Sequence, residues 1–330
     1  MASVDADPLI ATLLELGGAG LLVHEFGASA QAPKPNGRIV QLGVHRTGPL
    51  PCDDLEVFDI LLSAEPDAPA PWVGAGAQRL DAMVDGLRAA VAAQPAAAGV
   101  AAQVFRMTLG QSFDQALMLE SLAYSMLLAS RGFRGWRAAT PIRAKLDDAA
   151  PRVIVAQTGA MLEICLNRAA ARNAFDARMR DELVEALTFA LDHPDAPDVI
   201  LSGAGPGFSA GGDLDEFGRA SDPAIAHLIR TLRSPARLAH ELGPRLTARL
   251  HGACVGAGIE VPAGAGKVIA CSGALFRLPE VSMGLIPGAG GTATIPRRIG
   301  RQRACYMTLS GVELDAAAAL AWGLVDQVEA

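Results

Sequence analysis

Hydrophobic and polar positions follow two different spacings in the second half of the chain. Residues 152–166, RVIVAQTGAMLEICL, are rich in β-branched side chains and partly alternate with polar ones, which predicts two strands joined by a turn at Thr158 and Gly159. Residues 176–193 instead carry an apolar side chain at every fourth position, at Met179, Leu183, Leu187 and Leu191. This spacing predicts a helix, with Asp176 as its N-cap.

The rest of this half continues the same alternation. A helix is expected from Ser221, with an interruption at Pro235, and three short helices are expected near the end of the chain. Apolar runs predict strands at residues 199–202, 245–251, 267–271 and 274–278. Strands that alternate with helices imply an α/β fold with crossover connections.

The first 150 residues have a different pattern. Strands are expected at residues 38–44 and 57–63, and the alanine-rich stretch 76–137 is expected to be helical because it spaces apolar residues at Leu80, Val84, Leu87 and Val91. A second helix in this stretch is expected from about Ser112 to Ala129. We therefore divide the chain into a poorly defined α/β segment (1–71), a helical segment (72–150) and a core (151–330).

Composition and charge narrow the class of protein. Hydrophobic residues make up 51% of the 330 residues, yet no run of ~20 strongly apolar residues occurs, and the N-terminal residues MASVDADPLI lack a secretory pattern. We expect a soluble, cytoplasmic protein with no membrane partner. The net charge of −7 argues against a nucleic-acid partner. The five cysteines show no CxxC or Cys/His spacing, so we expect no metal site.

Two glycine-rich stretches, FSAGGD at 208–213 and CVGAGIE at 254–260, each lead to an acidic residue at the mouth of a helix. Amide N–H groups at the start of a helix have no partner within it and lie at the positive end of its dipole. If the two loops face each other, two amides can converge on one carbonyl oxygen as an oxyanion hole. The alternative is that the small residues only allow close packing. Neither loop fits the P-loop or the dinucleotide-binding motif.

Five stretches within residues 152–330 occur in a characteristic order: LNRAAARNAF, LSGAGPGFSAGGDLDEF, HGACVGAGIE, FRLPEVSMGLIPGAGGT and LSGVELDAAAALAWGLVDQV. In this order they resemble the crotonase superfamily, the enoyl-CoA hydratase/isomerase enzymes. The resemblance implies a spiral of ββα units, assembled as homotrimers or hexamers. It also implies an acyl-CoA thioester substrate whose enolate is stabilised at the thioester carbonyl. No metal or redox cofactor is expected, because coenzyme A is part of the substrate.

The resemblance assigns site residues by position. Glu260 and Glu280 match the two catalytic glutamates of hydratases, while Ala210 and Ala257 match the two residues whose amides form the oxyanion hole. Arg172 is a candidate contact for a CoA phosphate. Substrate contacts are implied for Arg172 and for residues of the two glycine-rich loops: Ser209, Gly212, Asp213 and Gly256. The basic run PRRIGRQR at 296–303 is either a further phosphate contact or a solvated or subunit-contact face.

Two carboxyl groups that flank one water can act as base and acid when water adds to a conjugated double bond. For both roles at neutral pH the pair must share one proton, which an apolar pocket favours because it raises the pKa of a glutamate above its usual ~4.3. The apolar neighbours of Glu260 and Glu280 predict such a pocket. The alternative for either glutamate is a helix-start carboxylate that only satisfies free N–H groups.

A helical cap is expected in an unusual place. Family members continue with helices that cover the acyl site, beyond the point that corresponds to the last residues here, WGLVDQVEA. Residues 76–137 resemble those helices, so we expect a cap that precedes the core through permutation or duplication. The alternative is an unrelated helical appendage.

The function predicted from these features is that of an enoyl-CoA hydratase in fatty acid metabolism. The alternatives are an enoyl-CoA isomerase, a thioester hydrolase, other acyl-CoA enolate chemistry and a non-catalytic subunit that binds acyl-CoA.

Overall fold

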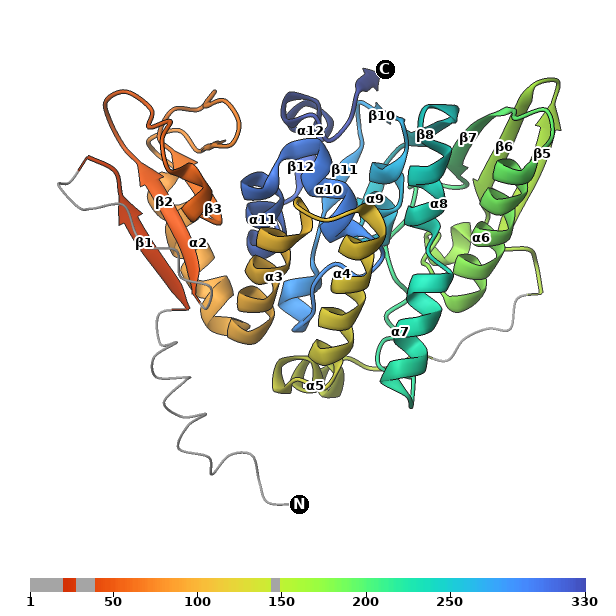
Figure 1. Ribbon diagram of the computed structural model, residues 1–330, viewed down its shortest axis with the longest axis horizontal. Coiled ribbons are helices and arrows are strands. Elements are labelled where there is room, and N and C mark those ends of the chain that lie inside the picture. The colour runs from red at the N-terminus through yellow and green to blue at the C-terminus, as the bar shows by residue number, and fades with distance from the viewer. Residues whose placement is uncertain (1–19, 28–38, 144–148) are drawn as a thin grey trace, which may run out of the picture.

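A computed structural model describes residues 20–27, 39–143 and 149–330 of the chain. The larger sheets have four and six strands. Figure 1 shows them toward opposite ends of the molecule, with a group of helices between them. The fold is mixed α/β, as the sequence predicts. None of the helices in the described ranges is both long and apolar enough to cross a bilayer.

The four-stranded sheet is built by the N-terminal segment. Its strands are β1 (Leu21–Glu25), β2 (Val40–His45), β3 (Ile60–Ser63) and β4 (Val73–Gly74), which pair in that order and run parallel. The expected strands near residues 38–44 and 57–63 are confirmed as β2 and β3, whereas β1 and β4 were not predicted. Residues 1–19 and 28–38 of this predicted segment lie outside the described residues.

Four helices connect this sheet to the core. They are α2 (Leu80–Ala93), α3 (Pro95–Thr108), α4 (Phe113–Leu128) and α5 (Arg131–Ala139). Pro95 begins α3, as suits a residue without an N–H to donate. Ser112 and Gln115 close a capping box at the start of α4. Helix α4 packs against α7 (Pro223–Leu232) and α10 (Gly291–Ile299) of the core. The predicted N-terminal cap is therefore present, while the three-way division of the chain stays a prediction.

The six-stranded sheet forms the body of the core. Its strands pair in the order β13-β10-β8-β7-β6-β5, and only β5 and β6 pair antiparallel. The predicted hairpin is confirmed by the antiparallel pairing of β5 and β6. The predicted N-cap at Asp176 is also confirmed, because the Met179 N–H donates to Asp176 Oδ1 over 2.8 Å. The strands are β5 (Val153–Thr158), β6 (Met161–Leu166), β7 (Asp198–Gly203), β8 (Leu246–Leu250), β10 (Lys267–Cys271) and β13 (Gln327–Glu329). The helices of this part are α6 (Ala177–Asp192), α7 (Pro223–Leu232) and α8 (Pro235–Leu242).

A smaller sheet lies beside it, in the order β12-β11-β9. Its strands are β9 (Ala253–Val255), β11 (Leu275–Arg277) and β12 (Leu314–Asp315). The associated helices are α9 (Ala257–Glu260), α10 (Gly291–Ile299), α11 (Arg301–Ser310) and α12 (Ala316–Trp322). The chain repeats a ββα unit as β5-β6-α6, β8-β9-α9 and β10-β11-α10. Helix α9 lasts one turn, since Pro262 has no N–H to donate to the Gly258 carbonyl and begins the 3-10 turn Pro262–Gly264.

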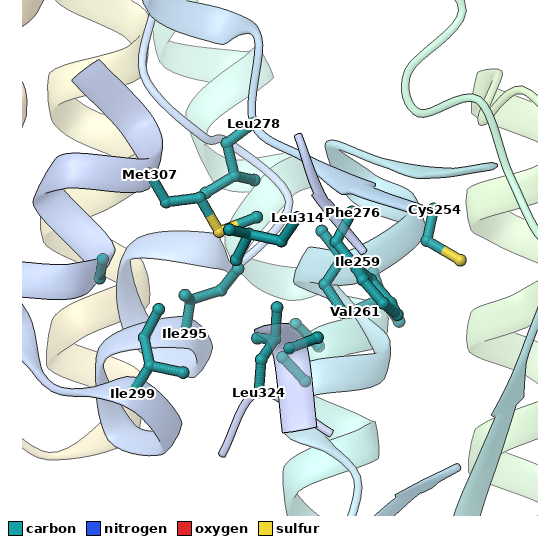
Figure 2. Packing of buried hydrophobic residues seen from close by; sticks show 14 of the residues in the cluster. Cys254, Ile259, Val261, Phe276, Leu278, Ile295, Ile299, Met307, Leu314 and Leu324 are labelled. Carbon is teal, nitrogen blue, oxygen red and sulfur yellow. The ribbon is translucent and has the colours of Figure 1, made fainter. Parts of the chain in front are cut away.

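Hydrophobic packing in the core holds the residues that flank Glu260. In Figure 2, Ile259 and Val261 lie close to Phe276 of β11, so the residues on either side of Glu260 are anchored in hydrophobic packing. The same cluster of buried side chains includes residues of the N-terminal sheet and of α2 and α3. The N-terminal segment therefore shares one hydrophobic core with the rest of the chain.

The basic run at residues 296–303 joins this segment to the core. Arg301 donates to the Glu56 carbonyl over 2.7 Å, and Arg303 donates to the Trp72 carbonyl over 2.9 Å. Arg298 forms an ion pair with Asp326 at 3.1 Å. Both expectations for this run, a phosphate contact and a solvated or subunit-contact face, are wrong for these side chains, because their N–H groups bind acceptors within the chain.

Candidate active site

The two glycine-rich loops lie against each other. The Ser209 N–H donates to the Ala253 carbonyl, and the Val255 N–H donates to the Ser209 carbonyl, each over 3.0 Å. The loops approach so closely that a Cβ on Gly258 would lie 2.6 Å from the Ser209 carbonyl oxygen, well inside contact distance. Glycine is therefore required at 258 for steric reasons, and the loops bring their amides to one place.

The amide of Ala210 does not face the site. Its N–H donates to the Arg172 carbonyl over 2.9 Å, so the prediction that it forms half of an oxyanion hole is wrong. The amide of Gly212, two residues later, is oriented differently. The peptide groups on either side of Gly212 bond to Phe175, which turns the N–H of Gly212 itself to the opposite side. Among the described residues that N–H has no acceptor.

The second predicted amide, that of Ala257, lies at the start of a helix. Ala257 is the first residue of α9, where the N–H has no partner within the helix. Gly256 makes this start possible, because its φ of 49° is one that residues with a side chain rarely adopt. No described residue accepts from the Ala257 N–H.

Gly212 and Ala257 line one cavity of about 250 Å³ together with Glu260 and Glu280. Its walls come from α4, the start of α6, the end of α7, and the loop before α10. Helix α4 thus contributes directly to the mouth of the site, as expected for a cap. The apolar part of the wall includes Leu117, Phe175 and Phe217.

Glu260 is the better stabilised of the two carboxyl groups. It is 2% exposed, and its Oε2 accepts from the N–H groups of Ala289 and Gly291 over 2.7 and 2.9 Å. Burial raises its pKa to about 7, while those hydrogen bonds from the start of α10 oppose the rise. This carboxyl can therefore lose its proton near neutral pH.

Glu280 has a drier and less supported carboxyl. It is 7% exposed, and its Oε2 is buried with no hydrogen-bond partner among the described residues. A Cβ at position 256 would lie 2.4 Å from its Oε1, so Gly256 leaves the space that this carboxyl fills. Burial, and next the charge of Glu260, raise the pKa of Glu280 well above its ordinary value.

A third carboxyl, Glu120, was not predicted. It comes from α4, is 2% exposed, and accepts from the N–H groups of Gly290 and Thr292 over 2.7 and 2.8 Å. The start of α10 is thus shared, with residues 289 and 291 bound by Glu260 and residues 290 and 292 by Glu120. Burial and then the charge of Glu260 raise the pKa of Glu120 to about 8.

One sequence signal could have revealed Glu120. In the stretch ALMLESLAY it lies three and four residues after Leu117 and Ala116, on the apolar face of the expected helix. A single acid on a buried face indicates a polar partner from elsewhere in the fold.

The other predicted substrate contacts differ in whether they reach the cavity. Asp213 lines the cavity and forms an ion pair with Arg168 at 2.8 Å. Ser209 is fully buried, donates through Oγ to the Asn173 carbonyl and accepts from the Gly211 N–H, so it supports the loop and is not available to a substrate. Arg172 is exposed and does not line the cavity, and Gly256 acts through its backbone turn. For Ser209 the predicted direct contact is wrong, and for Arg172 the phosphate contact stays a prediction.

Comparisons with known proteins identify the family to which this chain is related. The family model for enoyl-CoA hydratase/isomerase matches residues 156–330. The 2,3-dehydroadipyl-CoA hydratase of Escherichia coli K12 is 35% identical, over 53% of this chain and 68% of the relative. The mevalonyl-coenzyme A hydratase of Aspergillus fumigatus is 33% identical, over 51% of this chain and 62% of the relative.

Solved structures give the same family. An enoyl-CoA hydratase from Thermoplasma volcanium has a TM-score of 0.50 at 34% identity, covering 55% of this chain and 72% of that one. An enoyl-CoA hydratase/isomerase from Mycobacterium paratuberculosis has a TM-score of 0.51 at 29% identity, covering 56% and 74%. The chain spans about two thirds of the length of the curated relatives that it matches. On the family match and the cavity that its motifs form, this chain belongs to the enoyl-CoA hydratase/isomerase family.

Proposed function

We propose that the protein is an enoyl-CoA hydratase, which adds water reversibly and syn to a 2-trans-enoyl-CoA. One observation carries the proposal: two buried glutamates with raised pKa values share a cavity with two backbone amides that have no internal partner among the described residues. This combination supplies what hydration needs, namely a base, an acid and a place for negative charge.

The two amides hold the thioester carbonyl in the proposed reaction. As the water oxygen bonds to the β-carbon, negative charge moves to the thioester oxygen. The N–H groups of Gly212 and Ala257 donate hydrogen bonds to that oxygen. Because hydrogen bonds between the two glycine-rich loops already hold these amides in place, the amides need not move when the charge develops. Removing one such donor typically costs about 3–4 kcal/mol of barrier.

The environments of the glutamates divide the acid and base roles. Glu260, stabilised by two N–H donors, is the carboxyl group that ionises first. Its carboxylate takes a proton from the water while the water oxygen attacks the β-carbon. Glu280, buried and unsupported at Oε2, stays protonated and gives its proton to the α-carbon. The substrate gains one oxygen and two hydrogens, and a proton passes from Glu260 to Glu280 to restore the starting state.

The test is the loss of enoyl-thioester absorbance with 2-enoyl-CoA substrates from four to twelve carbons. We expect wild-type activity on at least one chain length. Glu260→Gln and Glu280→Gln should each lower kcat by about 10²–10⁴-fold, since each removes a proton-transfer group. Glu163→Gln, which changes an exposed glutamate of β6 away from the cavity, is the matched control.

Other outcomes favour the alternatives. If only one glutamate matters and the double bond moves, the isomerase is supported. Inactivity on every chain length, together with retained acyl-CoA binding, supports the non-catalytic subunit. The relatives named above act on acyl groups as different as dehydroadipyl and mevalonyl, so family membership leaves the acyl group open.

We also propose that no metal or redox cofactor takes part, so dialysis against EDTA should leave activity unchanged. A homotrimer or hexamer is supported by exposed apolar residues on two adjacent helices, Met118, Leu122 and Met126 on α4 and Leu228 and Leu232 on α7. Light scattering in solution tests it. A cytoplasmic location, a role in fatty acid metabolism, and the absence of membrane and nucleic-acid partners stay predictions.

A further inference from the structure

One wall of the cavity carries more positive charge than its partners neutralise. Arg180 of α6, Arg230 of α7 and Arg233, which follows α7, all line it. Arg180 forms a bidentate ion pair with Asp181, and Arg233 lies 3.5 Å from the same carboxylate and 3.9 Å from Glu185. The acidic residues Asp176 and Asp213, which also line the cavity, pair with Arg168 at 3.4 and 2.8 Å. Those carboxylates therefore have other partners.

Among the three arginines of this wall, Arg230 is the one for which no described carboxylate lies within ion-pair distance. Within the described residues its hydrogen bonds go only to neutral groups of α4: Nε donates to Ser121 Oγ over 3.0 Å, and Nη2 donates to the Ser121 carbonyl and to Ser125 Oγ. No carboxylate of the described chain lies within ion-pair distance of it. Its Nη1 has no acceptor among those residues, and Arg230 is one of the residues that line the cavity. Withdrawing a cation from water without an anionic partner is costly, so a ligand anion would complete this site.

The position of Arg230 indicates which part of a substrate it meets. Its guanidinium lies 5.0 Å from the centroid of the Tyr124 ring, and Tyr124 lines the cavity together with Glu260 and Glu280. Arg230 thus lines the same cavity as the reacting carboxyl groups. The pyrophosphate of CoA is separated from the thioester by the whole pantetheine arm. The acyl group, by contrast, must pass the two glutamates.

We propose that the acyl chamber is built for an acyl group whose far end is a carboxylate, a dicarboxylic acid linked to CoA at one end, and that Arg230 binds this carboxylate. Nη1 offers two free N–H groups to the carboxylate, and Arg180 and Arg233 add positive potential at the same wall. The cavity volume of about 250 Å³ suits a short acyl chain. The proposal rests on the proposed acyl-CoA chemistry at this site and adds its substrate class.

Binding of saturated analogues tests the proposal without turnover. Calorimetry would compare pairs of acyl-CoAs that differ only in a terminal methyl or carboxylate: butyryl and succinyl, pentanoyl and glutaryl, hexanoyl and adipyl. We expect the carboxylate member of at least one pair to bind wild type about tenfold more tightly, or ~1.4 kcal/mol. Arg230→Met should remove that preference with little change for the methyl member, and Arg230→Lys should keep part of it.

The controls separate the remaining explanations. Arg237→Met neutralises an arginine of α8 that pairs with Glu241 and does not line the cavity, so the preference should persist. Equal binding of both members of every pair to wild type would overturn the proposal, and this result needs no variant to fold. Equal weakening of both members by Arg230→Met would assign the residue to CoA phosphates or to packing, and would also overturn it.

Turnover distinguishes this proposal from the hydratase proposal. Hex-2-enoyl-CoA and 5-carboxypent-2-enoyl-CoA differ in the same way, and kcat/KM should favour the carboxylate substrate. Hydration of both at equal kcat/KM would leave the hydratase standing and refute the carboxylate site. A binding preference for the carboxylate member without hydration of either substrate would support the carboxylate site and refute the hydratase proposal.

Discussion

Replacing Glu120 by Gln should change how stability depends on pH. Glu120 is buried where α4 meets α10, and its pKa is raised from an ordinary value of 4.5 to about 8. A raised pKa means that the folded protein holds a proton that the unfolded chain has already released. Glu120 therefore contributes stability that is fully present below pH 4.5 and is lost as the pH rises through about 8.

The size of the effect follows from the pKa and the contacts. At 1.36 kcal/mol for each pKa unit, the wild type should lose up to about 5 kcal/mol of unfolding free energy from this group between pH 4 and pH 9. Gln cannot ionise, so that loss disappears. At pH 5 the variant should be less stable by about 1–2 kcal/mol, because its amide has one acceptor oxygen for the N–H groups of Gly290 and Thr292.

Urea unfolding, followed by circular dichroism at pH 5, 6, 7, 8 and 9, measures both terms. The variant should begin below wild type and overtake it as the pH rises. Glu185→Gln makes the same chemical change at a side chain that is 72% exposed and should run parallel to wild type. A constant difference between Glu120→Gln and wild type at every pH would show that Glu120 is not the buried acid described above.

Three further substitutions test other parts of the account. Ala257→Pro removes the proposed oxyanion N–H at the first position of a helix, where proline is tolerated. Its kcat should fall about 10²–10³-fold, while Ala257→Gly should stay near wild type. Equal activity of the two variants would show that the Ala257 amide takes no part in the oxyanion hole. Ser209→Ala should lower the unfolding free energy by about 1–3 kcal/mol and leave KM within threefold, whereas a large rise in KM at unchanged stability would restore it as a substrate contact. Asp59→Ala leaves Arg106 and Arg301 without their buried partner, so chemical denaturation should show a loss of about 3–5 kcal/mol, and a loss below 1 kcal/mol would mean that the N-terminal sheet is not held by this contact.

Local patterns in the sequence predicted the core elements well. The hairpin β5-β6 and the helix α6 follow from alternation, four-residue spacing and the Asp176 cap, which are properties of neighbouring residues. Glu260, Glu280 and Ala257 could be placed because motifs of the family fix their position relative to a strand end or a helix start.

The remaining features depend on contacts between distant parts of the chain. Whether Ala210 or Gly212 presents a free amide is decided by the bridge to Phe175, which fixes the direction of successive peptides and cannot be read from glycine content. Glu120 meets Gly290 across 170 positions of sequence. The arginines at 298–303 look like a basic patch in the sequence, and only the fold provides the acceptors that bind them.

The central claim is that Glu260 and Glu280 together add water across the double bond of an enoyl thioester held by two amides. Its most direct test is NMR of the product formed from a 2-enoyl-CoA in ²H₂O. We expect wild type to form a 3-hydroxyacyl-CoA with one deuterium at the α-carbon, and both Glu→Gln variants to form it at least 10²-fold more slowly. Recovery of unchanged enoyl-CoA, or of a product whose double bond has moved without gain of a hydroxyl group, would contradict it.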